Sequence, residues 1–172
     1  MSARAAARLE SLGFTRVFRY QPGKADWLAN GLPTEGKYAD VTRVGDLARH
    51  EVPTCRLGDR VGDIAERART SGLNVCVVVT AERVVLGLLR PQALDADPST
   101  TVEQVMECGP KTYRPHVLPD RAAEYMRKHE LDSVLVTTSD GELLGVLRRK
   151  DAQREAADGQ PANKRQQESG NK

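Results

Sequence analysis

Few residues of this chain combine the types and spacing that catalysis or metal binding requires. The three histidines, His50, His116 and His129, lie far apart in the sequence, and none has a cysteine or carboxylate partner at metal-ligand spacing. The sequence has no Walker loop, no Gly-x-Gly-x-x-Gly motif after a strand and no defensible Ser-His-Asp arrangement. It therefore predicts neither a metal site nor a catalytic centre.

A basic cluster near the end of the chain is a better candidate for ligand chemistry. Arg148, Arg149 and Lys150 are consecutive, and Arg154 follows them on the same predicted helix. Guanidinium and ammonium groups attract the phosphates of a ligand. The same pattern is also typical of a solvated helix face, so both interpretations stay open.

Composition narrows the class of protein. The chain has 26 Lys and Arg residues against 24 Asp and Glu, a net charge of +2, which does not favour a dedicated nucleic-acid or membrane-surface protein. Neither a run of 18 apolar residues nor an apolar signal sequence is present. Cys55, Cys76 and Cys108 form no Cys-x-x-Cys pair, which is typical of free thiols in a reducing compartment. We expect a cytoplasmic protein.

An internal repeat organises most of the chain. Sliding the sequence against itself by 58 residues superposes Thr42 on Thr100, for example, and apolar positions coincide without a gap across most of residues 42–152. Thr80 likewise falls on Thr138, 58 residues further on. The chain therefore contains two copies of one supersecondary unit. A unit of this size buries little core alone, so we expect the two copies to pack on each other.

Each copy is predicted to run helix, strand, helix, strand, strand, helix. Val61, Ile64, Ala65 and Ala68 repeat at helical spacing in the first copy. Apolar runs predict the strand pairs, and Asp140-Gly141 is a favoured hairpin turn. The four predicted strands that form these pairs are Val75–Val79, Val84–Leu89, Ser133–Thr137 and Glu142–Leu147.

The duplicated unit resembles a tandem pair of CBS domains, the regulatory module named after cystathionine β-synthase. The resemblance also rests on the run that closes the second copy, Gly145-Val146-Leu147-Arg148-Arg149-Lys150-Asp151. The family has Gly, two mostly apolar residues, Thr or Ser, two variable residues and Asp there. The resemblance covers residues 41–156. It implies an α/β fold of two β-α-β-β repeats with pseudo-two-fold symmetry, each with a small sheet and helices on one side.

The resemblance also implies a function. In that family the cleft between the copies holds adenosine ligands such as AMP, ADP, ATP or S-adenosylmethionine, and the closing Asp, here Asp151, binds the ribose hydroxyls. A carboxylate suits two vicinal hydroxyls because it accepts two hydrogen bonds. Carried over by position, the ligand-binding residues of the second copy are Thr112, Tyr113, Arg114, Val134, Val136, Arg148 and Asp151.

This sequence departs from the family pattern in both copies. Arg90 and Arg148 stand where the family has Thr or Ser; a guanidinium there either grips a phosphate, which favours a polyphosphate ligand, or fills the pocket. In the first copy the closing Asp is replaced by Ala93. The first site is therefore expected to be degenerate or silent. Its candidate residues are Thr54, Cys55, Arg56 and Arg90.

Residues 1–36 lie outside the repeat. Their pattern predicts a helix over Ala5–Leu12, a strand over Thr15–Tyr20 and a second helix over Lys24–Ala29. The run resembles the C-terminal end of a rhodanese (sulfurtransferase) domain, whose chemistry needs a loop cysteine before the first of these helices. No cysteine precedes Cys55, so we expect a structural remnant in which Phe14, Phe18 and Trp27 pack on a neighbour.

The sequence thus divides into a rhodanese-like remnant (1–36), a first CBS repeat (41–95), a second CBS repeat (99–156) and a disordered tail (158–172). We expect a non-catalytic regulatory module without an obligatory cofactor, which binds an adenine nucleotide or related small molecule, forms a homodimer and acts on an unknown regulated protein. The alternatives are a structural dimerisation or partner-binding module with degenerate ligand sites, and a sulfurtransferase fragment that works once completed. A nucleic-acid role ranks last.

Overall fold

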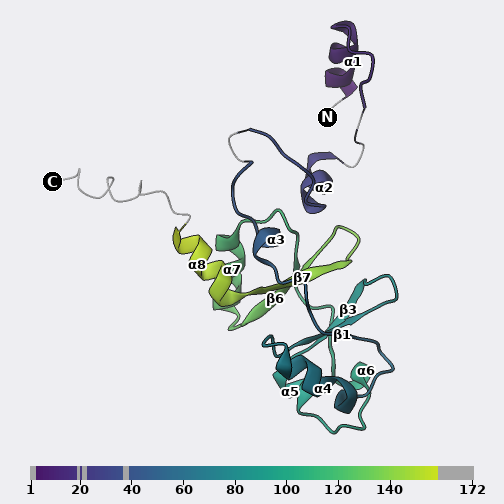
Figure 1. Cartoon of the computed structure of the whole chain (residues 1–172), viewed down its shortest axis with the longest axis vertical. Coiled ribbons are helices and arrows are strands. Elements are labelled where there is room, and N and C mark those ends of the chain that lie inside the picture. Colours follow the sequence, from purple (N-terminus) through teal and green to yellow (C-terminus); the bar gives the residue numbers. More distant parts are fainter. Residues whose placement is uncertain (1–2, 19, 21–22, 37–38, 159–172) are drawn as a thin grey trace, which may run out of the picture.

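The 58-residue offset of the sequence reappears as two matching sets of elements in the computed structural model, which describes residues 3–18, 20, 23–36 and 39–158 (Figure 1). The first set is α3 (Val44–Leu47), β1 (Thr54–Cys55), α4 (Val61–Thr70), β2 (Cys76–Val79), β3 (Val85–Leu89) and α5 (Pro91–Leu94). The second set is α6 (Val102–Val105), β5 (Thr112–Tyr113), α7 (Pro119–Lys128), β6 (Ser133–Thr137), β7 (Leu143–Arg148) and α8 (Arg149–Asp158). The predicted α/β fold of two β-α-β-β repeats is confirmed.

The two sheets share one topology. In the first, β1 pairs in parallel with β2, and β2 pairs antiparallel with β3; in the second, β5, β6 and β7 do the same. The registers differ by the repeat offset, since Thr54 lies opposite Val77 and Thr112 opposite Leu135. The first sheet has a fourth strand that the sequence did not predict, β4 (Glu107–Cys108), on the free edge of β3.

The central strands are apolar throughout because both of their faces are buried. In β2, Cys76 and Val78 pack under α4, whereas Val77 and Val79 point to the second sheet. Alternate side chains of a strand point to opposite faces, so a strand covered on both sides needs a continuous apolar run. The cluster between the sheets contains Leu73, Val75, Val77, Val79, Leu88, Leu135, Leu143 and Val146.

The opening helix of each repeat packs in the core of the other repeat. Val44, at the start of α3, donates its backbone N–H to the carbonyl of Val117 over 2.9 Å and lies in the cluster of the second repeat. In the symmetric contact, Val102 donates to the carbonyl of Asp59 over 2.9 Å and lies in the cluster of the first repeat. The predicted boundaries at 41–95 and 99–156 therefore separate each opening helix from the core that it completes.

The exchange continues along the backbone after each opening helix. Arg49 pairs with Val146 of β7, and Glu107 pairs with Leu88 of β3, again at the repeat offset. The backbone of Arg49 comes so close to β7 that a Cβ atom on Gly145 would lie 2.5 Å from the Arg49 carbonyl oxygen. Only glycine fits there without displacing one of the two backbone segments.

The segment before the repeats forms α1 (Ala3–Ser11) and α2 (Gly23–Ala29), close to the two predicted helices. The predicted strand over Thr15–Tyr20 is wrong for its described residues, which pair with no other strand. Phe14 and Phe18, which were predicted to pack on a neighbour, are 59% and 77% exposed. The rhodanese resemblance of this segment stays a prediction.

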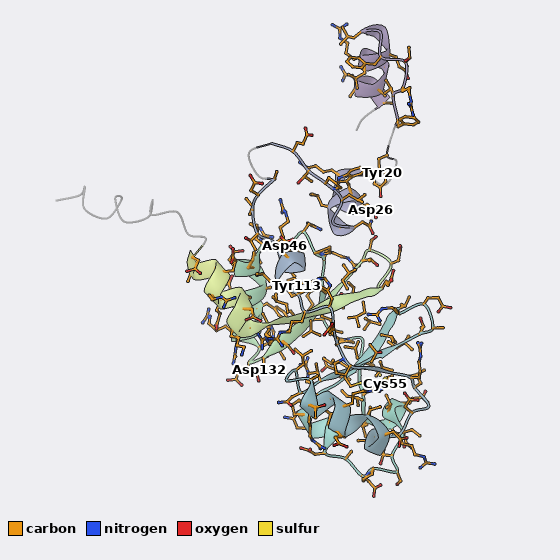
Figure 2. The ribbon with its side chains drawn as sticks, viewed as in Figure 1. Tyr20, Asp26, Asp46, Cys55, Tyr113 and Asp132 are labelled. Carbon is orange, nitrogen blue, oxygen red and sulfur yellow. The ribbon has the colours of Figure 1, made fainter. Side chains whose placement is uncertain are left out.

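The Asp26 side chain of α2 contacts the second repeat. The Ser139 hydroxyl, in the β6–β7 turn, donates to the Asp26 carboxylate over 2.9 Å, and the Tyr20 hydroxyl donates to the same carboxylate over 2.5 Å. Figure 2 shows Tyr20 and Asp26 close together beside α2. Trp27 packs edge-on against Tyr20 with ring centroids 5.2 Å apart.

At the other end of the chain, Asp158 is the last residue of α8, so the first residue of the predicted disordered tail is helical. The remainder of that tail lies outside the described residues. Within the described part of the chain, no helix has the length and apolar character to cross a membrane.

Replacing Gly145 with alanine tests the exchanged packing. The added methyl group would press on the Arg49 carbonyl, so we expect Gly145→Ala to lower the free energy of unfolding by about 2 kcal/mol, measured by urea denaturation. Gly58→Ala is the matched control, because a Cβ atom at Gly58 meets nothing within 4 Å. Equal stability of the two variants would contradict the close approach at Gly145.

Candidate functional site

The strongest candidate site lies where β7 passes into α8. Arg148 ends the strand and Asp151 stands in the first turn of the helix, where a carboxylate interacts favourably with the helix dipole. The Arg148 guanidinium donates from Nε to Asp151 Oδ2 over 2.7 Å and from Nη2 to Oδ1 over 3.1 Å. The two side chains are only 20% and 15% exposed. The two site residues that the sequence placed in one motif therefore form a half-buried, two-pronged ion pair.

This ion pair sets the protonation state of the acid. The hydrogen bond from Arg148 holds the pKa of the Asp151 carboxyl below its usual value, and the charges of Arg148, Arg154 and Arg49 act in the same direction. Burial opposes them. Asp151 is therefore ionised at neutral pH and able to accept hydrogen bonds on both oxygens.

The first repeat arranges the equivalent arginine differently. Arg90 directly follows the matching strand β3 and is the N-cap of α5, but position 93 is alanine, so no carboxylate stands one helical turn later. Its Nε instead donates to the Glu107 carboxylate over 2.5 Å. Glu107 belongs to the exchanged strand β4, which explains why the sequence pattern of the first repeat did not reveal this partner.

A cavity of about 510 Å³ lies between the repeats next to both arginines. Its lining follows the pseudo-two-fold axis, because each repeat contributes the same two stretches, the approach to its second strand and the start of its last helix. These stretches are Gly72–Val75 with Arg90–Gln92, and Glu130–Ser133 with Arg148–Lys150, and Gln153 completes the lining. The cavity is therefore shared by the two repeats.

Charge in this cavity is concentrated on the side of the second repeat. Arg148, Arg149 and Lys150 line it there, and Arg149 donates to the Asp132 carboxylate over 2.7 Å. Figure 2 labels Asp132 on the side of the second repeat that faces the first. The basic cluster of the sequence thus lines a cavity, although Arg154 does not belong to the described lining. Such a cavity suits a small anionic ligand.

Arg114, a predicted ligand contact, serves the fold at the opposite end of β6. Its guanidinium donates to the Thr137 hydroxyl over 2.6 Å, to the Ser139 carbonyl over 3.2 Å and to the Thr138 carbonyl. Arg56 makes the equivalent contact, to the Val79 carbonyl over 2.8 Å. Both arginines therefore tie down a hairpin.

The distance along β6 separates Arg114 from the ion pair. Arg148 lies opposite Ser133 at the start of β6, whereas the Arg114 contacts begin at Thr137. Four strand residues span about 13 Å. The structure does not bring Arg114 together with Arg148 and Asp151.

The neighbouring predicted residues contribute to packing. Tyr113 packs edge-on against Tyr125 of α7, with ring centroids 6.0 Å apart, and Lys111 Nζ lies 5.7 Å from each ring centre. Burial, with the nearby Tyr125, raises the pKa of Tyr113. Thr112, beside it on β5, is half-buried and pairs with Leu135.

The apolar candidates are core residues. Val134 and Val136 are 3% and 0% exposed and lie in the cluster under α7 and α8. Cys55 is 4% exposed, and its hydrogen bond with Cys76, together with burial, raises the pKa of its thiol. Thr54, beside Cys55 on β1, is half-buried.

Sequence reasoning missed part of the cavity lining. Asn74, Asp132 and Ser133 lie just before or at the start of the second strand of each repeat. The repeat offset pairs Asn74 with Asp132, and this symmetry was the available signal. Among the described residues, no group of three or more His, Cys, Asp or Glu side chains is arranged to hold a metal ion.

Comparison with known proteins agrees with this fold. Residues 102–158 match the family model of the CBS domain. The chain is 27% identical over 115 residues to the arabinose 5-phosphate isomerase KpsF of Escherichia coli, a match that covers 63% of this chain and 35% of the isomerase. The chain thus spans about a third of the length of the curated relatives that it matches.

Solved structures extend the likeness to both repeats. The CBS domains of a transcriptional regulator from Streptococcus pneumoniae superpose with a TM-score of 0.61 at 27% identity, over 67% of this chain and 99% of that one. CBSX2 in complex with AMP superposes with a TM-score of 0.61 at 20% identity, over 67% of this chain and 96% of CBSX2. The cytosolic domain of the Mg²⁺ channel MgtE in complex with ATP superposes with a TM-score of 0.61 at 22% identity, over 66% of this chain and 48% of that one.

The second repeat thus matches the CBS model directly, and the first repeats its elements at a constant offset and exchanges its opening helix with it. Residues 102–158 are thus similar to the CBS domain, and the two repeats together share the fold of the solved CBS-domain structures.

Proposed function

We propose that this chain is a non-catalytic regulatory module that binds an adenosine ligand, such as AMP, ADP, ATP or S-adenosylmethionine, between its CBS repeats. The observation that carries the proposal is the pairing of Asp151 with Arg148, which lines a basic cavity of about 510 Å³ shared by the two repeats. A cavity of this size accommodates one ligand of nucleotide size. Related CBS structures in complex with AMP and with ATP support the choice of ligand class.

The second repeat carries most of the proposed binding. Asp151 would accept hydrogen bonds from the ribose hydroxyls, and Arg148 would contact phosphate. Ser133 and Asp132 stand across the cavity from the first repeat. We assign Thr112, Tyr113, Arg114, Val134 and Val136 to supporting this half-site from β5 and β6, in keeping with their contacts.

The proposed regulatory effect depends on the exchanged packing. A ligand between the repeats would favour one arrangement of the pair, and the exchanged helices α3 and α6 would transmit that preference to both cores. The shift in arrangement is limited by the ligand's differential affinity for the two states. We propose that a homodimer of this chain passes the change to a separate regulated protein in the cytoplasm. The isomerase activity of the longer KpsF relative is not part of the proposal.

One observation favours the alternative of a structural dimerisation or partner-binding module. In both repeats the arginine that replaces the family's hydroxyl is already paired, Arg148 with Asp151 and Arg90 with Glu107. Ligand sites that had decayed into internal ion pairs would look the same. Binding measurements separate the two functions.

Titration calorimetry with AMP, ADP, ATP and S-adenosylmethionine tests the proposed site. We expect saturable binding by the wild-type chain, and we expect Asp151→Ala to weaken it on the order of 100-fold, since a half-buried charged acceptor is lost. Asp63→Ala is the matched control, because Asp63 is the exposed third residue of α4, as Asp151 is the third residue of α8. Failure of a folded wild-type chain to bind any of the four adenosine ligands would favour the structural module.

Restoring the missing carboxylate tests the difference between the repeats. Ala93 is the third residue of α5 and stands where Asp151 stands in α8. We expect Ala93→Asp to add a second, weaker binding event for AMP to the isotherm of the wild-type chain. Gln92→Asp adds the same charge one residue earlier and should leave the stoichiometry unchanged. An unaltered isotherm for a folded Ala93→Asp variant would show that the first repeat lacks more than the acid.

A further inference from the structure

The Arg148 guanidinium, and not the Asp151 carboxylate that it binds, lines the cavity. Arg148 belongs to the described lining of the cavity, whereas Asp151 does not. Both Asp151 oxygens accept hydrogen bonds from the guanidinium, over 2.7 and 3.1 Å. We therefore expect a ligand hydroxyl that enters from the cavity to reach an Asp151 oxygen by displacing the Arg148 guanidinium.

An arginine released from Asp151 needs another anion. Arg148 is only 20% exposed, so its guanidinium does not regain full hydration by turning within the cavity. The acidic residues of the cavity are Asp132, which already accepts a hydrogen bond from Arg149 over 2.7 Å, and Glu130, which is exposed to solvent. A further cation, Lys150, lines the same side. The surroundings of Arg148 thus favour an anion supplied by the ligand.

A phosphate group matches this requirement. Its oxygens accept two parallel hydrogen bonds from a guanidinium, as the Asp151 carboxylate does in the present pair. We infer that Arg148 exchanges Asp151 for a ligand phosphate, and that this exchange makes the cavity selective for phosphorylated adenosine ligands over neutral nucleosides. The inference rests on the proposed function, and Arg148 is its specificity-determining residue.

The exchange predicts different affinities for AMP and adenosine. AMP offers ribose hydroxyls to Asp151 and a phosphate to Arg148, so both members of the ion pair keep a partner. Adenosine offers only the hydroxyls and leaves a half-buried guanidinium without an anion. Leaving a charged group unsatisfied costs enough to lower affinity on the order of 10-fold to 100-fold.

Calorimetric titrations of AMP and adenosine test the inference. We expect the wild-type chain to bind AMP at least ~10-fold more tightly than adenosine, and Arg148→Thr to lose most of this ratio by weakening AMP and strengthening adenosine. Arg148→Gln, neutral but similar in length, should behave in the same way and serves if the threonine variant fails to fold. Arg148→Lys keeps the charge without the fork and should give an intermediate ratio.

Arg127→Thr is the control, since Arg127 is an exposed cation of α7 outside the described cavity lining. This control should leave the ratio of the AMP affinity to the adenosine affinity near the wild-type value. A ratio that stays unchanged in Arg148→Thr and Arg148→Gln, while both ligands still bind, would overturn the inference and leave the proposed function standing. Absence of binding of AMP and adenosine by the folded wild-type and variant chains would overturn the proposed function itself.

Discussion

The rest of the structure depends on the exchange of opening segments between the two repeats. Val44 fills the core of the second repeat and Val102 that of the first, and both are fully buried. Arg49 and Glu107 then extend each other repeat's sheet. Neither repeat has a closed core or a covered sheet edge without the other. The contacts that stabilise each repeat are therefore the same contacts that fix the position of one repeat relative to the other.

This arrangement places the cavity on the pseudo-two-fold axis. The two sheets pack through Val77 and Leu135. Arg90, which follows β3, and Arg148, which ends β7, both line the cavity. Since α8 begins directly after Arg148, Asp151 lies in the first turn of the helix and pairs with Arg148, which lines the cavity. The two halves of the cavity share a geometry but differ chemically, because one has Asp151 and the other Ala93.

Much of this fold could be predicted from the sequence, because the constant offset between the repeats and the continuous apolar runs of the central strands can both be read from the residue types. The strand over Ser133–Thr137 was predicted with its observed bounds, and the run around Cys76–Val79 was recognised as a buried strand. The exchange of α3 and α6 could not be predicted, since an apolar residue such as Val44 signals burial but not the repeat in which it is buried. The two-residue strand β4 is too short for a periodic pattern and exists only because β3 offers it an edge.

The candidate site was predictable in part for the same reason. The closing motif identified Arg148 and Asp151, but their pairing depends on side-chain geometry at the start of α8. Arg114 shares a repeat with them and is separated from them by the length of β6, which sequence position alone does not show. Asp132 and Asn74 line the cavity but belong to no sequence motif, so only the repeat offset that pairs them could have indicated their role.

A crystal structure of the chain with AMP would test the central claim most directly. The account predicts one AMP between the repeats, with its ribose hydroxyls on the Asp151 carboxylate and its phosphate on the Arg148 guanidinium. AMP bound at another surface, or an intact Arg148–Asp151 ion pair in crystals grown at a saturating AMP concentration, would contradict it.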